Sequence, residues 1–117
     1  IAIDFLRGKT EVIESIQKSN AEFFITSVNI FEIWNGRFEK EEKLIEELFD
    51  SLYKEDFSPK AAIIAANIDR ELKKTGNSTE FRDIFIASIC IEKGLELMTN
   101  NRKHFERMSK FGLLIAD

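Results

Sequence analysis

The sequence predicts an α/β fold in which helices cover a central parallel sheet, formed as one domain over residues 1–117. Short runs of branched, aromatic and other apolar residues, such as 22–26 and 95–99, alternate with longer segments of helical periodicity. Strands that alternate with helices indicate βαβ units, and such units build parallel sheets with helices on their faces. A chain of 117 residues that is 44% hydrophobic can form one core of this kind.

The first half of the chain holds alternating signals for helices and strands. In chain order, we expect a short helix that ends at Gly8, a helix from Thr10 to about Lys18, a strand over 22–26, a helix capped by Ser27 that ends near Gly36, and a charged helix over 39–54. The last of these helices carries an apolar stripe and is otherwise covered by Glu and Lys.

The second half has stronger local signals. Ser58 is placed to cap a helix, Pro59 follows at its first position, and Gly76 stands just beyond its end. The elements expected after it are a helix from Thr79 to about Lys93 with Gly94 as its stop, a strand over 95–99, a short helix over 102–110 and a last strand over 113–116.

Composition excludes several classes of protein. The net charge of −4 argues against a passive nucleic-acid binder, which normally carries a basic stripe, but it allows an acidic site that needs a metal ion before it approaches phosphate. The single cysteine, Cys90, cannot form an internal disulfide, which agrees with a reducing compartment. No apolar run reaches the ~20 residues of a membrane span and no signal-peptide pattern is present, so we expect a cytoplasmic protein without a membrane partner.

Asp83 raises the main chemical question, because it stands directly before the apolar run 84–91. Burial of a carboxylate beside such a run is unfavourable unless another group pairs with it or a cation binds it. Its position near the start of a helix also allows a purely local role, in which the helix dipole stabilises the acid.

Several polar residues fall where strands end and helices begin, which is where ligands gather in open α/β sheets. Ser27 and Glu32 follow the strand 22–26, Asp83 opens its helix, and Asn101 follows the strand 95–99 with His104 one turn further on. Clusters of carboxylates suit Mg²⁺ or Mn²⁺, ions that activate water and stabilise charge on a phosphoryl group. We therefore expect Glu32 and Asp83 to converge in one cleft lined by Asn101, although Asn101 also suits a simple turn or helix cap.

Three stretches of the sequence, FFITSVNIFEIWNG, EFRDIFIASICIEKGLELMTNN and NNRKHFERM, resemble segments of the PIN-domain family, and specifically of the VapC-type toxins of toxin–antitoxin pairs. The opening IDFLRG resembles the segment that follows the family's first strand. The similarity runs along the whole chain in order. It implies a three-layer α/β/α fold with a central parallel sheet, and the activity of a metal-dependent ribonuclease.

The resemblance also implies a set of site residues. Glu32 and Asp83 match two catalytic, metal-binding acids, and Asn101 falls where the family has a further Asp or Asn ligand. Two such acids repel one another without a cation, so Asp83→Asn is expected to leave the metal-free melting temperature level or higher. The remaining implied residues support the site or contact substrate phosphate: Ser27, Thr99 and His104 in the first role, and Arg102 and Lys103 in the second.

One feature of the family is missing from the sequence. The family's first acid lies in a Leu-Asp-Thr/Ser-Asn-like motif at the end of the first strand, and that motif is expected just before Ile1. We therefore expect the domain of residues 1–117 to lack its first strand. Asp4 is no substitute, because it aligns with a non-catalytic position. The alternative function is a catalytically degenerate PIN-fold domain that binds a protein or RNA partner without cleaving it.

The partners that the resemblance implies are an RNA substrate, a cognate antitoxin and a second copy of the chain in a homodimer. Trp34, Phe38, Phe49 and Tyr53 either pack inside a helical hairpin or form a groove that receives the antitoxin. A phosphate-receiver type of α/β domain is disfavoured, because no lysine or threonine follows the strands at the spacing that such a site needs.

Overall fold

The structure is a computed structural model that describes residues 1–3, 16, 18–19, 21–37 and 39–116. The helices expected over 4–8 and 10–18 therefore lie largely outside the described residues, as does Phe38.

Within the described residues, five strands form one sheet in the order β3-β2-β1-β4-β5, and every neighbouring pair is parallel. The predicted parallel sheet is confirmed. Its strands are β1 (Ala2–Ile3), β2 (Phe24–Thr26), β3 (Tyr53–Glu55), β4 (Glu96–Met98) and β5 (Leu114–Ile115). The expected absence of a first strand that carries the acidic motif stays a prediction.

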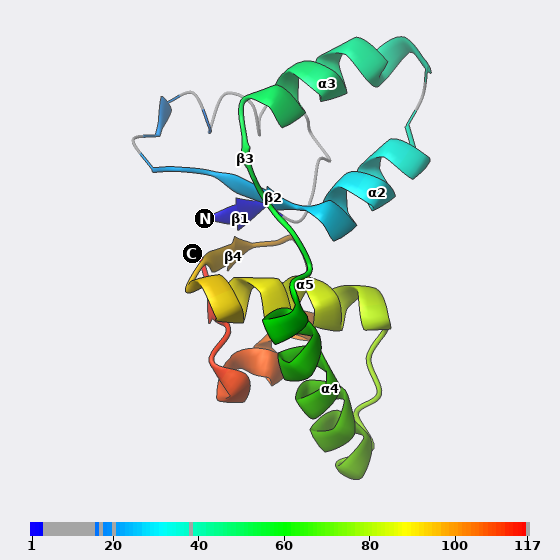
Figure 1. The fold of residues 1–117 in the computed structure, drawn as a ribbon, viewed down its shortest axis with the longest axis vertical. Helices are drawn as coiled ribbons and strands as arrows, with labels where there is room; N and C mark the ends of the chain where they lie inside the picture. Colours follow the sequence, from blue (N-terminus) through cyan, green and yellow to red (C-terminus); the bar gives the residue numbers. More distant parts are fainter. Residues whose placement is uncertain (4–15, 17, 20, 38, 117) are drawn as a thin grey trace.

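Helices cover both faces of the sheet, as a three-layer α/β/α fold requires. The helical elements are α2 (Ser27–Asn35), η1 (Glu39–Glu41), α3 (Glu42–Asp50), α4 (Pro59–Lys74), α5 (Phe81–Lys93), α6 (Arg102–Phe105) and η2 (Glu106–Phe111), where η marks a 3₁₀ helix. In Figure 1, α2 and α3 lie on one side of the strands, and α4 and α5 lie on the other.

The alternation of side chains along the strands divides the core in two. Ile3 and Ile25 pack with α3 on one face, whereas Ala2 and Leu97 pack with α4 and α5 on the other. The helix α5 is buried over most of its surface, because α4 covers the side that faces away from the sheet (Figure 1). The apolar run 84–91 is thus a central helix, as predicted.

Two sequence-based assignments in this region are wrong. The charged helix expected over 39–54 ends at Asp50, and Tyr53–Glu55 is an edge strand instead. The Tyr53 backbone N–H donates to the Phe23 carbonyl, because β2 offers an open edge for pairing. The cap of α2 is Thr26 and not Ser27, which occupies the first helical position.

In the second half of the chain, the helices α4 and α5 begin and end close to the residues at which the sequence predicted their ends. The Ser58 hydroxyl caps α4 by accepting from the Ala61 N–H at 3.0 Å, and it also donates to Glu92 Oε1 at 2.6 Å. Gly94 ends α5 with a φ of 67°, in the left-handed region that favours glycine. The cap of α5 is Glu80, one residue later than the expected start at Thr79.

Among the residues that the structure describes, no helix combines the length and apolar character needed to cross a bilayer.

Candidate active site

Three helices bring polar side chains to the edge of the sheet where the parallel strands end. The strand β2 leads directly into α2, which carries Glu32. The helix α5 runs back along the sheet before β4, so its first turn places Asp83 at this edge. His104 lies on α6, shortly after β4 ends. The edge predicted from the sequence is therefore the place where these groups gather.

Asp83 is the buried acid of this cluster, with 8% of the residue exposed. Its Oδ2 lies 2.9 Å from His104 Nε2, and its Oδ1 lies 3.6 Å from Arg82 Nε. It also occupies the first turn of α5, where the helix dipole favours a negative charge. These neighbours explain how a carboxylate is tolerated beside an apolar helix.

Arg82 joins the two candidate catalytic acids. Its Nη1 lies 3.1 Å from Glu32 Oε2 and its Nη2 lies 3.2 Å from Glu80 Oε2, in addition to its contact with Asp83. Glu32 and Asp83 thus face the same guanidinium group from different helices, as their predicted convergence requires. The pKa of Arg82 is raised: burial acts to lower it, but the charges of Glu32, Asp83 and Glu80 outweigh that effect.

The turn between β2 and α2 is fixed by buried polar contacts. Thr26 Oγ1 accepts from the Asn29 N–H at 3.1 Å and donates to Asn29 Oδ1 at 2.7 Å, and both residues are buried. This turn sets the direction of α2 and hence the position of Glu32. Ser27, the residue predicted to support the site, is only partly buried, and Thr26 caps α2 in its place.

The other residues predicted for the site follow β4, and most of them are exposed. Thr99 Oγ1 accepts from the Asn101 N–H at 3.0 Å, which shapes the turn into α6. Among the described residues, the Asn101 side chain makes no hydrogen bond with Glu32 or Asp83, and the residue is exposed. Arg102 turns toward the end of the chain, where Nη1 donates to the Ala116 carbonyl at 2.8 Å. Lys103 is exposed on the same short helix.

The donor atoms fit a hard divalent cation. Glu32 and Asp83 supply carboxylate oxygens, which Mg²⁺ and Mn²⁺ prefer, and these acids already surround a positive group. In the described part of the chain, no group of three or more His, Cys, Asp and Glu side chains is arranged to hold a metal. Two carboxylates are compatible with Mg²⁺, which keeps several waters and often binds through one or two acids and a substrate phosphate.

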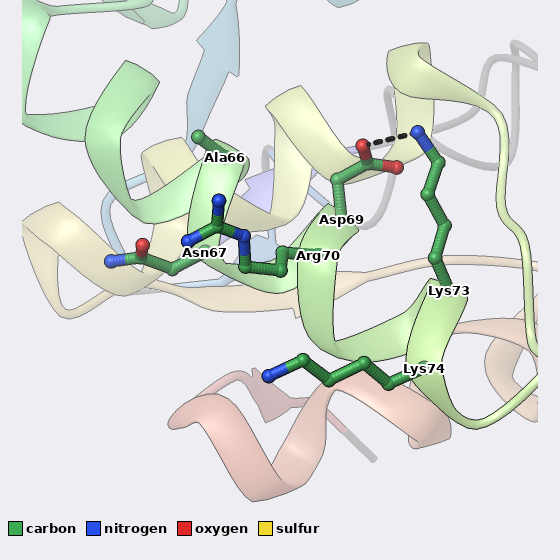
Figure 2. Close-up of a pocket in the computed structure, with 6 residues that line it drawn as sticks. All are labelled: Ala66, Asn67, Asp69, Arg70, Lys73 and Lys74. Atoms are coloured by element: carbon green, nitrogen blue, oxygen red, sulfur yellow. Dashed lines mark ion pairs between the residues drawn. The ribbon is translucent and has the colours of Figure 1, made fainter.

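A separate hollow lies along α4, a helix that packs against α5 but carries neither of these acids. It has a volume of about 660 Å³ and is lined by Ala66, Asn67, Asp69, Arg70, Lys73 and Lys74. Figure 2 shows that all six come from one helix and that Asp69 pairs with Lys73, at 2.9 Å. One helix face encloses no substrate, so we place the chemistry at the carboxylates and not in this hollow.

The described aromatic residues that were predicted to form either a core or a groove differ in burial. Trp34 and Phe49 pack against each other in the core, with ring centroids 6.5 Å apart. Tyr53 is 58% exposed on the edge strand, and Phe31, on α2, is 68% exposed. Phe31 was not among the residues predicted for this surface, and its exposure on α2 is decided by the fold.

Sequence reasoning also missed the position of Arg82. Adjacent residues on a helix do not face each other, so its place next to Asp83 did not indicate that it reaches Glu32 on another helix. The signal in the sequence was the closeness of Arg82 to Glu80 and Asp83, which indicates pairing with nearby acids such as the observed Arg82–Glu80 pair but does not point to Glu32.

Known proteins resemble this chain in both sequence and fold. A family model described as "PIN domain" matches residues 1–111. Ribonuclease VapC3 of Methanocaldococcus jannaschii is 35% identical over 89 residues, which cover 76% of this chain and 89% of the relative. Ribonuclease VapC1 of the same organism is 34% identical over 94 residues, which cover 80% of this chain and 69% of the relative. A crystal structure of DNA-bound VapBC from Salmonella typhimurium superposes with a TM-score of 0.86 at 25% identity, covering 99% of this chain and 96% of that one.

Proposed function

The chain belongs to the PIN-domain family, and from that premise we propose that it is a metal-dependent endoribonuclease, the toxin of a toxin–antitoxin pair. The relatives named ribonuclease VapC support hydrolysis of RNA, and the structural neighbour titled VapBC supports an antitoxin partner. The observation that carries the proposal is the convergence of the Glu32 and Asp83 carboxylates on one cationic group at the carboxyl edge of the sheet.

Glu32 and Asp83 would hold Mg²⁺ or Mn²⁺, and Asn101 would line the same cleft. When bound, the ion supplies positive charge that activates water and stabilises the phosphoryl group during in-line displacement. His104 lies against Asp83 Oδ2 and so holds the orientation of that carboxylate, much as outer groups orient metal ligands elsewhere. Ser27 and Thr99 would support the backbone turns on either side of the site.

Substrate RNA carries a regular series of phosphates, which an acidic protein binds through local basic groups. Lys103 is exposed next to the site, and Arg102 lies one residue before it at the start of α6. We assign both residues to phosphate contacts, which for Arg102 requires release from the Ala116 carbonyl. The positive charges of Arg102 and Lys103 would attract phosphate locally, although the chain as a whole has a net charge of −4.

The antitoxin would bind the apolar surface of α2, α3 and β3. Phe31, Leu44 and Tyr53 are the exposed large hydrophobic residues of these elements. Such a surface suits an amphipathic helix that lays its apolar face into a groove. A homodimer, in which the two copies pack through helices, is part of the same proposal.

The test measures RNA cleavage with purified full-length protein in the presence of Mg²⁺, Mn²⁺ or a chelator. Glu32→Gln and Asp83→Asn should each lose cleavage, because each removes a charged metal ligand without changing the side-chain shape. Glu46→Gln and Asp50→Asn are matched controls, since both acids are exposed on α3. Cleavage that persists in both site variants, or in chelator, would overturn the proposal. A folded protein that binds its antitoxin and cleaves no RNA with either ion would instead be the degenerate interaction domain.

A further inference from the structure

We propose that Arg82 is a positioning residue that holds Glu32 and Asp83 together before the metal binds, and that it competes with the metal for these two carboxylates. The inference rests on the proposed metal-dependent function but assigns a role to a residue outside the ligand set. The contacts of one guanidinium with acids from two helices carry it.

The geometry places Arg82 between the acids. Glu32 belongs to α2, and Asp83 belongs to α5, so nothing in the local chain keeps their carboxylates close. Arg82 reaches Glu32 Oε2 with Nη1 at 3.1 Å and Asp83 Oδ1 with Nε at 3.6 Å. Different nitrogens of the planar guanidinium contact different acids, and a lysine, which has a single ammonium group, cannot reproduce this arrangement. Without a cation the two carboxylates repel, and the guanidinium offsets that repulsion.

Competition follows because metal and guanidinium need the same oxygens. A unit charge held about 5 Å from a divalent ion repels it, even in water, enough to weaken ion binding about tenfold. The metal must therefore either displace Arg82 or bind more weakly beside it. An arginine in a protein does not lose its proton, so deprotonation of Arg82 cannot relieve the repulsion between its guanidinium and the metal ion.

Displacement is sterically simple. The Arg82 side chain is 50% exposed, whereas that of Asp83 is only 11% exposed, so the arginine moves into solvent without disturbing the core. Glu80, whose side chain is 72% exposed, remains within reach and keeps the freed guanidinium at the rim of the site. At the rim, the group stands where a substrate phosphate approaches the ion.

The experiment compares Mn²⁺ binding by the parent, Arg82→Gln, Arg82→Lys and Arg70→Gln, measured as the shift in melting temperature along a Mn²⁺ titration. Arg70 is exposed on α4, so its variant removes the same charge away from the acids. Arg82→Gln should melt lower without metal, yet bind Mn²⁺ about tenfold more tightly than the parent. Arg70→Gln should match the parent, and Arg82→Lys should fall between the parent and Arg82→Gln.

A second readout needs only the parent protein. The Arg82 Nε–H resonance, identified by its absence from the Arg82→Lys spectrum, should exchange slowly with water in the metal-free state and rapidly at saturating Mg²⁺. Equal Mn²⁺ midpoints for the parent, Arg82→Gln and Arg70→Gln, or an Arg82 signal unchanged by Mg²⁺, would overturn the inference and leave the metal site standing. If Mn²⁺ stabilises none of the four proteins, the proposed metal-dependent function fails together with it.

Discussion

Replacement of Asp83 by Asn tests the site most directly, because it preserves the shape of the side chain and removes its charge. Two features stabilise that charge, namely Arg82 Nε at 3.6 Å and the first turn of α5, whereas His104 Nε2 lies 2.9 Å away without a hydrogen bond. The contact with half-exposed Arg82 contributes about 0.5 kcal/mol, and the acid at the helix N-terminus contributes about 0.5 kcal/mol.

Relief of repulsion from Glu32 opposes these losses by about 1 kcal/mol. The gain and the losses cancel to within about 0.5 kcal/mol without metal, so the melting temperature should stay within about 2 °C of the parent's. From the sequence alone we expected a level or higher melting temperature. The contacts keep the expectation of a level melting temperature, because Arg82 already compensates the paired acids and the mutation removes one of its partners.

The assay combines thermal melting, with and without Mn²⁺, and RNA cleavage by the full-length parent, Asp83→Asn and the exposed control Asp50→Asn. An ion at a hundred times its Kd stabilises the parent by about 2.7 kcal/mol, and Asp83→Asn should lose most of that gain together with cleavage. The reasoning is refuted if Asp83→Asn cleaves RNA at the parental rate and gains as many degrees from Mn²⁺ as the parent.

Three further predictions concern the scaffold and the partner surface. Thr26→Ala should lower the free energy of unfolding by about 1 to 2 kcal/mol in urea, since it removes the buried cap of α2; an unchanged midpoint would contradict the assigned cap. Gly94→Ala should cost about 1 kcal/mol because its φ is 67°, whereas Gly36→Ala, at a φ of −95°, is the control expected to be neutral. Phe31→Ser should change stability by less than about 0.5 kcal/mol, because the side chain is 68% exposed, yet weaken antitoxin binding in calorimetry; unchanged affinity would move the antitoxin surface elsewhere.

Local chemistry explains which features were predictable from the sequence. The signals at Ser58, Pro59 and Gly94 act within one helical turn, so the bounds of α4 and the end of α5 followed from neighbouring residues. Alternation of strands with helices gave the parallel sheet and the edge at which Glu32 and Asp83 lie. The residue types at that edge then indicated a hard divalent cation.

The tertiary structure decided what depends on distant partners. Tyr53–Glu55 forms a strand because it pairs with the open edge of β2. The helical periodicity of 39–54 carries no information about that edge, which lies in another part of the chain. Arg82 reaches Glu32, and His104 reaches Asp83, only because packing brings α2, α5 and α6 together at the end of the sheet. The sequence by itself determined which acids are available for the site. Which nitrogen-bearing side chains surround them depends on how the helices pack, since contacts between helices are set by the fold and not by neighbouring residues.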